Sequence, residues 1–179
     1  MFKFLLRWFT GGSKPEPSSK PKDYPQKTSS RPLLPPEISY DDGLIEKLTT
    51  DHIKLLHLFG EIKTAAEQEN YAALPGLLST FRLALQTHLM LENVKFYAYV
   101  QQHLEKDSET LIFINDVKRE MDGIVRAAMR FSNTYKTQKA VMEKPADFLK
   151  ELGGIGEALV KRVTLEETRL YTLYLPSYQ

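Results

Sequence analysis

The chain of 179 residues has no cysteine. This absence excludes disulfides, cysteine-ligated zinc sites and thiol nucleophiles, so any bound metal must be held by His, Asp or Glu side chains. A chain without cysteine is compatible with the reducing cytosol, although many exported domains also lack the residue. We expect a cytoplasmic protein.

The chain also has no large excess of positive or negative charge, because 24 Lys and Arg residues are balanced by 23 Asp and Glu residues. Nucleic-acid-binding domains usually carry a basic patch or stripe, so nucleic acid is not an expected partner. The sequence offers no nucleophile and base with a third orienting group. We therefore expect a binding protein and not an enzyme.

The most apolar run, Met1–Phe9, lacks the length to cross a bilayer, which takes roughly 20 apolar residues. It contains two cations, ends before Gly11-Gly12 and has no signal-peptide cleavage site. Residues 1–12 therefore predict a short amphipathic segment that contacts the surface of the inner membrane. The alternative is that this segment docks on the protein's own surface or on a partner.

Residues 13–39 have few apolar side chains and are rich in Pro, Ser and Lys. Such a segment cannot bury enough apolar surface to offset the entropy lost on folding. We interpret it as a disordered linker, and we place the folded domain at residues 40–176.

The folded domain predicts an all-α protein with four long helices joined by short connections, which is typical of an antiparallel up-down-up-down bundle. Asp41 or Asp42 caps the first helix, and Asn70 caps the second unless Pro75 delays its start. Pro145 suits the first turn of the fourth helix. The predicted ranges are 41–68, 70–103, 108–139 and 145–175.

Each predicted helix has apolar residues at three- and four-residue spacing, which is typical of a face buried in a bundle. Tyr97 lies off these rows, and we interpret it as part of a binding surface. Five polar side chains interrupt the rows, and burial of an unpaired charge is costly, so these groups must pair with one another or bind something. They are His52, His88, Glu92, Arg162 and Glu166.

The spacing of these positions indicates that they lie at one height. In an antiparallel helix pair, two residues face each other when their midpoint falls in the connecting turn. The midpoint of positions 52 and 88 is position 70, in the first predicted turn, and the same test places Met121 opposite positions 92 and 162. The predicted layer contains His52, His88 or Glu92, Met121 and Arg162, with Glu166 one helical turn away.

Two segments carry the signature of a metal-binding bundle: Asp51-His52, and His88-Leu-Met-Leu-Glu92. With them the sequence resembles the hemerythrin-like family, also called the HHE cation-binding domain family, over residues 44–176. The resemblance implies a four-helix bundle with a non-haem di-iron centre. In that family a Glu-His or His on the third helix and a second His-x-x-x-Glu motif on the fourth complete the centre.

The second half of this pattern departs from the family, because Glu120-Met121 and Arg162-Val-Thr-Leu-Glu166 stand where histidines are expected. A thioether is a poor ligand for iron, and a guanidinium cannot ligate. The favoured interpretation is a metal-free salt-bridge network, the alternative is one iron ion, and a di-iron centre is not expected. The resemblance thus implies a degenerate metal site at His52, His88, Glu92 and Glu166.

Two functions are consistent with the hemerythrin-like resemblance, and a third follows from a second, shorter resemblance. The first is a regulatory module that acts through a protein partner, and the second is a non-haem iron sensor of oxygen or redox state. A shorter stretch, from Ile155 to Glu167, resembles the last helix of the bacterial regulator-of-sigma-D family, whose members are metal-free bundles that bind the primary sigma factor. This resemblance implies the third function, an anti-sigma-type regulator.

Gly153, Gly154 and Gly156 lie inside the fourth predicted helix, where each costs about 1 kcal/mol relative to alanine. A phosphate-binding loop requires a preceding strand, so the match to that motif is poor. We predict close helix packing or a local kink at these glycines.

Overall fold

The structure is a computed structural model that describes residues 37–104 and 109–176. They fall within one structural unit, Pro36–Gln179. The predictions for residues 1–12, and for residues 13–36 of the linker, lie outside the described residues. Among the helices of the two described ranges, none combines the length and hydropathy needed to cross a membrane.

All regular structure in these two ranges is helical, as the sequence predicts. Two of the long helices continue directly into π-helical segments, and the last of these leads into a short 3-10 helix. The elements are α1 (Leu44–Glu67), α2 (Leu74–Leu91), η1 (Glu92–Tyr97), α3 (Ala98–His103), α4 (Glu109–Thr134), α5 (Gln138–Glu143), α6 (Pro145–Leu165), η2 (Glu166–Leu170) and η3 (Tyr171–Leu173).

The starts of the first two helices differ from the prediction. Helix α1 begins after Gly43 without a side-chain cap, and the Asp41 carboxylate instead accepts a hydrogen bond from the Gly43 backbone N–H at 3.2 Å. Helix α2 begins at Leu74, so Asn70 is not its cap, and Pro75 lies in its first turn. Proline suits this position because the first backbone N–H groups of a helix have no intrahelical acceptor.

The third predicted helix is divided in the structure. Helix α4 ends at Thr134 and not near Lys139, and a separate short helix, α5, follows. The Thr137 hydroxyl caps α5 by accepting a hydrogen bond from the Ala140 backbone N–H at 3.3 Å. Pro145 is the first residue of α6, as predicted.

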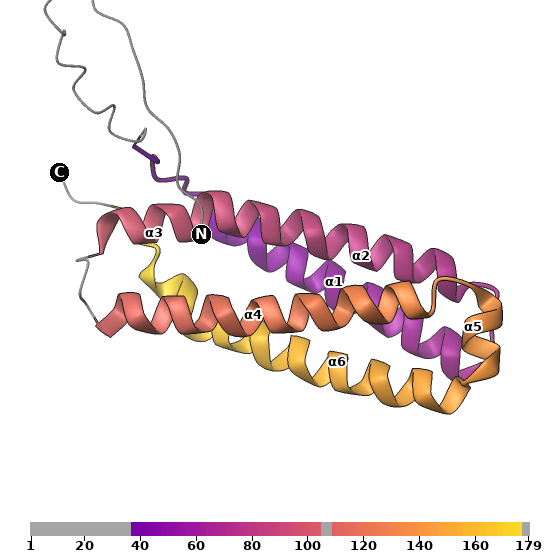
Figure 1. Ribbon diagram of the computed structural model, residues 1–179. Helices are drawn as coiled ribbons and strands as arrows, with labels where there is room; N and C mark the ends of the chain where they lie inside the picture. The colour runs from indigo at the N-terminus through magenta and orange to yellow at the C-terminus, as the bar shows by residue number, and fades with distance from the viewer. Residues whose placement is uncertain (1–36, 105–108, 177–179) are drawn as a thin grey trace, which may run out of the picture. The chain divides into compact units, whose positions relative to one another are not determined.

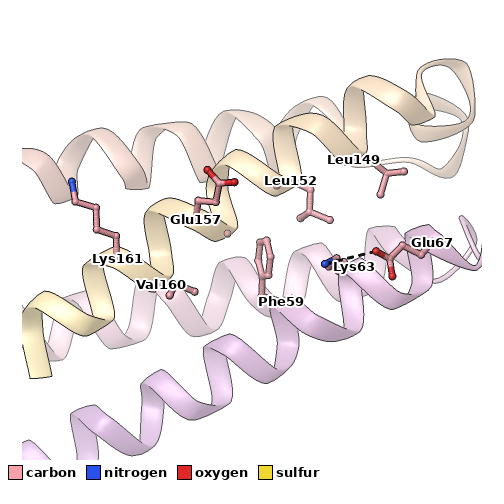
Figure 2. A pocket seen from close by; sticks show the side chains of 10 residues that line it. Phe59, Lys63, Glu67, Leu149, Leu152, Glu157, Val160 and Lys161 are labelled. Atoms are coloured by element: carbon pink, nitrogen blue, oxygen red, sulfur yellow. Dashed lines mark ion pairs between the residues drawn. The ribbon is translucent and has the colours of Figure 1, made fainter.

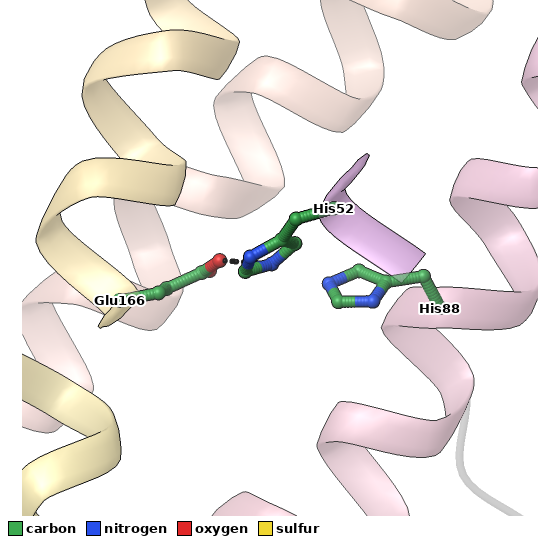
Figure 3. A group of neighbouring side chains, drawn as sticks. All are labelled: His52, His88 and Glu166. Carbon is green, nitrogen blue, oxygen red and sulfur yellow. Dashed lines mark ion pairs between the residues drawn. The ribbon is translucent and has the colours of Figure 1, made fainter. Parts of the chain in front are cut away.

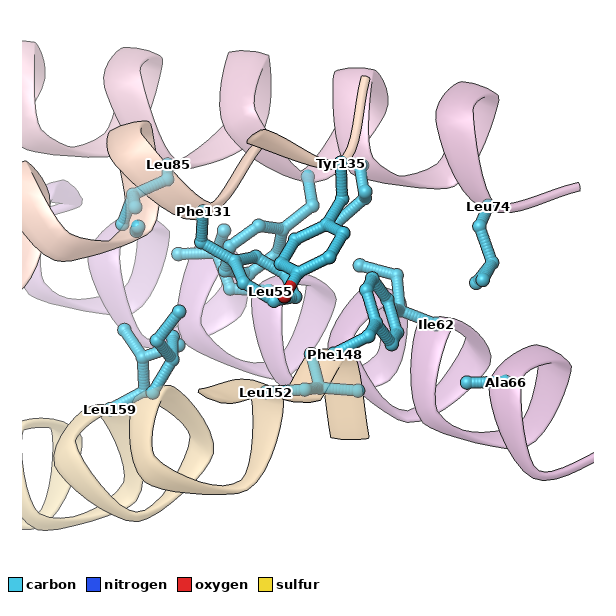
Figure 4. Packing of buried hydrophobic residues seen from close by; sticks show 14 of the residues in the cluster. Leu55, Ile62, Ala66, Leu74, Leu85, Phe131, Tyr135, Phe148, Leu152 and Leu159 are labelled. Atoms are coloured by element: carbon cyan, nitrogen blue, oxygen red, sulfur yellow. The ribbon is translucent and has the colours of Figure 1, made fainter. Parts of the chain in front are cut away.

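Four helices build the bundle and surround its core. Helix α1 packs against α2 and α6, and α4 packs against the same two helices; Figure 1 shows these helices side by side. Buried apolar residues form two clusters, and Figure 4 shows part of the first. The five buried polar residues that interrupt the apolar rows lie between these two clusters along the sequence. On each helix that carries them, they are flanked by a member of the first cluster on one side and a member of the second on the other: Leu55 and Leu48, Leu85 and Phe96, and Leu159 and Leu170.

A groove with a volume of about 730 Å³ runs between α1 and α6 (Figure 2). Phe59 extends from α1 toward α6, and a Cβ atom added at Gly156 would lie 2.6 Å from its ring. This contact confirms the close-packing prediction for Gly156. Apart from the local backbone of α6, no heavy atom of the described residues lies within 4 Å of a Cβ added at Gly153 or Gly154, so packing does not explain these two glycines.

Candidate metal centre

His52 lies in the middle of α1 and has only 1% of its surface exposed. Its Nε2 atom is 3.0 Å from Oε2 of Glu166, and its Nδ1 atom is 2.8 Å from Oε1 of Glu167. The hydroxyl of Tyr171 lies 3.3 Å from the same Nε2 atom. A carboxylate that accepts from Nδ1–H orients the ring, and once Nε2 has lost its proton this arrangement directs the Nε2 lone pair toward a metal, as carboxylates do behind metal-binding histidines.

His88 faces His52 from α2, with 4.7 Å between the ring centroids. Its Nδ1 atom is buried and has no hydrogen-bond partner in the part of the chain that the structure describes. His52, His88 and Glu166 each offer one ligand atom, and these atoms lie within 4.8 Å of one another. Figure 3 shows the three side chains converging from three helical segments. The structure therefore brings together three of the four predicted ligands.

Glu92 is the predicted ligand that falls outside this group of three. It has 1% of its surface exposed, and no donor group of the described residues reaches either carboxylate oxygen; a hydrogen bond to the Glu166 carboxylate forms only when Glu92 is protonated. Together with Tyr97 and Met121, it lines a cavity of about 330 Å³ between α2 and α4. Met121 thus lies near Glu92, as the midpoint argument predicts.

Arg162 is buried, with 3% of its surface exposed, and all its contacts are with other buried groups. Its Nε donates a short hydrogen bond to Oε1 of Glu166. Its Nη1 donates to the Val117 carbonyl at 2.9 Å, and its Nη2 donates to the Tyr97 hydroxyl at 2.6 Å. Each of the three guanidinium nitrogens therefore has a hydrogen-bond acceptor. The Glu166 carboxylate interacts with both Arg162 and His52.

The two glutamates of the motif occupy equivalent places in the backbone. Glu92 begins the π-helical segment η1, and Glu166 begins the π-helical segment η2. Each π segment accommodates one extra residue per turn, and such segments are frequent at functional sites. No feature of the sequence predicts them.

The pKa values of His52 and Glu166 indicate an ion pair. Burial alone would lower the pKa of His52, but the hydrogen bonds and charges of Glu166 and Glu167 outweigh it and raise the pKa above 6.5. Burial alone would raise the pKa of Glu166, but His52 and Arg162 outweigh it and lower the pKa. Both shifts favour the charged forms.

The pKa values of His88 and Glu92 change in the opposite sense. Burial, together with the charge of His52, lowers the pKa of His88 to about 4. Burial, together with the charge of Glu166, raises the pKa of Glu92 well above 4.5. In the absence of a ligand, both groups are therefore favoured in their neutral forms.

The structure also corrects and extends the predicted set of residues. Tyr97 is not part of a surface, since it is 2% exposed and its hydroxyl accepts from Arg162. Glu167 and Tyr171 contact His52 but were not assigned a role by the sequence. Glu167 directly follows the predicted ligand Glu166 in the sequence, whereas nothing in the spacing indicated Tyr171.

These donors suit one metal ion and do not suit two. Two imidazoles and a carboxylate are ligands that iron and other divalent metals accept, and one of these imidazoles, that of His88, has an unpartnered Nδ1 atom among the described residues. The buried carboxylate of Glu92 is a further oxygen donor in the same layer. A second ion would require ligands at positions 121 and 162. The thioether of Met121 is a poor donor, and the Arg162 guanidinium is a cation already bonded to Glu166.

Comparison with known proteins gives one match. The family model described as the hemerythrin HHE cation binding domain matches residues 43–174. No curated protein and no solved structure matches the chain significantly. The matched range contains every residue of the centre.

Proposed function

Because the chain belongs to the hemerythrin HHE cation-binding domain family, we propose that it is a regulatory module that binds a single divalent metal ion. Its helices are arranged up-down-up-down in this proposal, with iron as the ion that the family resemblance implies. The ligands are His52, His88 and Glu166, and Glu92 is the nearest additional carboxylate.

The observation that carries this proposal is the contrast between satisfied and unsatisfied groups. Arg162, Glu166 and His52 satisfy one another, whereas Nδ1 of His88 and both oxygens of the ionised Glu92 carboxylate have no partner within residues 37–104 and 109–176. Leaving such groups unpaired in the interior costs about 1–3 kcal/mol each. A single ion on the α2 side of the layer would compensate this cost. A second ion would be repelled by the positive charge of Arg162.

The residues have separable roles in this proposal. Glu167 holds the His52 ring with Nε2 directed toward Glu166, and His88 approaches from α2. Arg162 holds Glu166 in place through Nε, while Tyr97 and the Val117 carbonyl hold Arg162. When bound, the ion supplies a positive charge that links α1, α2 and the segment η2 at one layer.

Metal analysis of the purified protein after anaerobic incubation with ferrous iron tests the proposal. We expect about one iron per chain, and a chelator should lower the melting temperature because the ion stabilises only the folded state. Two irons per chain would show that Arg162 does not exclude the second ion. A folded chain that takes up no ion would overturn the single-ion proposal.

A metal-free network is the second candidate, and it is favoured by the contacts of Arg162, Glu166, His52 and Glu167. Buried ion pairs of this kind can set helix register instead of adding stability. In that case a chelator would leave the melting temperature unchanged, and neither ferrous iron nor zinc would raise it.

The proposed output is a contact with a protein partner and not a reaction. Support comes from large apolar side chains on the surface, among which Ile53 and Met90 are each 70% exposed. Cross-linking followed by mass spectrometry would identify a partner, and Ile53→Asp and Met90→Asp variants should weaken its capture. The primary sigma factor as the captured protein would support the anti-sigma-type alternative.

The oxygen or redox sensor remains the other alternative. This function requires that the bound ion change its oxidation state. A regulatory module with a structural ion has no such requirement. Absorption spectra of the iron-loaded protein before and after exposure to air distinguish these two functions.

A further inference from the structure

We infer that this centre selects divalent over trivalent metal ions, because Arg162 adds a fixed positive charge directly behind a ligand. The inference rests on the proposed single-ion site and concerns the charge of the ion that it accepts. It follows from the hydrogen bonds of one carboxylate and from a count of the buried charges.

The Glu166 carboxylate has two roles that compete. Its Oε2 atom belongs to the ligand group and lies 3.0 Å from Nε2 of His52. Its Oε1 atom accepts the short hydrogen bond from Nε of Arg162. The negative charge that would neutralise a bound ion is therefore already shared with a guanidinium, which weakens its attraction for a cation.

Arg162 cannot move away to relieve this competition. Its Nη1 and Nη2 atoms donate hydrogen bonds to the Val117 carbonyl and to the Tyr97 hydroxyl, and the side chain has a relative exposure of only 2%. A guanidinium stays protonated at any working pH. The positive charge is thus permanent and fixed in position.

The charge count leaves too little negative charge for a trivalent ion. His52 and His88 are neutral when they ligate, and the charges of Glu166 and Arg162 cancel. Glu92 is the remaining fully buried carboxylate of the layer. The Glu167 side chain is 40% exposed, and the Asp51 side chain, whose charge also acts on His88, is 21% exposed and paired with Lys54 at 3.2 Å. With Glu92 ionised, a divalent ion leaves a net charge of about one, and a trivalent ion leaves about two.

An additional unit of charge is costly in the interior of the bundle. For charges about 6 Å apart at an effective dielectric constant of about 20, repulsion by the Arg162 guanidinium weakens binding roughly 100-fold for each unit of charge on the ion, so a trivalent ion loses roughly 100-fold more than a divalent one. A site with this penalty favours the divalent state of its ion. It would therefore transmit the presence of a metal ion and not its oxidation state.

The test compares binding of Mn²⁺ with binding of Ga³⁺ supplied from a citrate buffer, since gallium is trivalent and redox-inert. The affinity ratio is measured for the full chain and for Arg162→Gln, which removes the fixed charge. We expect Arg162→Gln to shift the ratio toward gallium by roughly 100-fold. Arg162→Lys, which keeps a positive charge, should leave the ratio within about tenfold of the wild-type value.

Lys161→Gln is the matched control. It removes one positive charge from the adjacent position of α6, where the Lys161 side chain is 77% exposed and lies 3.5 Å from Glu120. Solvent screens that charge, so the ratio should stay unchanged. An equal shift in Lys161→Gln and Arg162→Gln would overturn the role of Arg162.

A measurement on the unmodified protein makes the test independent of variant folding. Ferrous iron is loaded without oxygen, the protein is exposed to air, and the iron that remains ferrous is determined with a ferrous-specific chelator. Retention of ferrous iron supports the inference, and rapid conversion to protein-bound ferric iron overturns it while leaving the single-ion proposal intact. Failure to bind Mn²⁺ or ferrous iron at all overturns the single-ion proposal itself.

Discussion

The Nη2 atom of Arg162 donates a hydrogen bond of 2.6 Å to the hydroxyl of Tyr97, across the interior of the bundle. The two residues lie on α6 and η1, 65 positions apart in the sequence. Hydrogen bonds to charged groups contribute about 1.5–3 kcal/mol each. Tyr97 therefore helps to make a buried guanidinium tolerable in a layer where the family resemblance implies a metal ligand.

The variant Tyr97→Phe should lower the free energy of unfolding by about 2 kcal/mol, because it leaves a buried cationic N–H without an acceptor. Urea denaturation of the wild type and the variant measures the difference. Tyr135→Phe is the control, since its hydroxyl donates to the exposed Glu151 at 3.1 Å and its loss should cost less than about 1 kcal/mol. Equal costs for the two variants would contradict the proposed role of Tyr97.

The double variant Met121→His with Arg162→His should raise the metal content from about one ion per chain to about two. The reason is that both changes restore nitrogen ligands beside the existing group, and the second also removes the competing cation. Elemental analysis after anaerobic loading with ferrous iron measures the content. The variant Met121→Leu with Arg162→Met is the control, because it removes the cation without adding ligands.

A folded double variant that still binds one ion would mean that positions 121 and 162 do not face the same part of the layer. The cavity that Met121 lines together with Glu92 and Tyr97 argues for a shared layer.

The burial of His88 predicts a pH dependence of stability for the metal-free protein. Its folded-state pKa is about 4, below the unfolded value of 6.5, so between these limits the unfolded chain binds a proton that the folded chain does not. The contribution of His88 to stability is therefore complete above pH 6.5 and decreases as the pH falls toward 4, by up to about 3 kcal/mol.

Glu92 acts in the opposite direction, because its raised pKa makes the folded chain bind the extra proton above pH 4.5. The measurement is therefore a comparison between the wild type and His88→Gln, both of which retain Glu92. In urea denaturation with a chelator present, the wild type should lose more stability than His88→Gln between pH 7 and pH 4. Parallel curves would contradict the neutral state of His88.

The helical rows of the sequence were sufficient to predict which polar residues are buried. His52, His88, Glu92, Arg162 and Glu166 each have 3% or less of their surface exposed. The prediction succeeded because a regular helix repeats every 3.6 residues, so residues at three- and four-residue spacing share one face. The convergence of His52, His88 and Glu166 follows from the same regularity.

Departures from that regularity account for the residues that the sequence misplaced. In a regular α-helix Phe96 follows Glu92 on the core row and Tyr97 points elsewhere. The π-helical segment η1 adds a residue to this turn, so that both Phe96 and Tyr97 are buried. In the same way η2 brings Tyr171 inward beside His52.

The three glycines of α6 predict opposite effects of the same substitution. At Gly153 and Gly154, a Cβ atom meets no heavy atom within 4 Å, so Gly153→Ala and Gly154→Ala should each stabilise the protein by about 0.5–1 kcal/mol through helix propensity. At Gly156, the Cβ atom would lie 2.6 Å from the Phe59 ring. Gly156→Ala should therefore destabilise the protein by about 1–2 kcal/mol, since one of the two side chains must shift.

Thermal denaturation of the three variants, with Phe59→Leu added to each, separates propensity from packing. Leucine lacks the ring atoms that the new Cβ would meet, so Phe59→Leu should remove most of the penalty of Gly156→Ala. It should leave the effects of Gly153→Ala and Gly154→Ala unchanged, because independent sites are additive. If Gly156→Ala is as stabilising as Gly153→Ala, the Phe59 ring turns into the groove without cost, and close packing is not the reason for glycine at position 156.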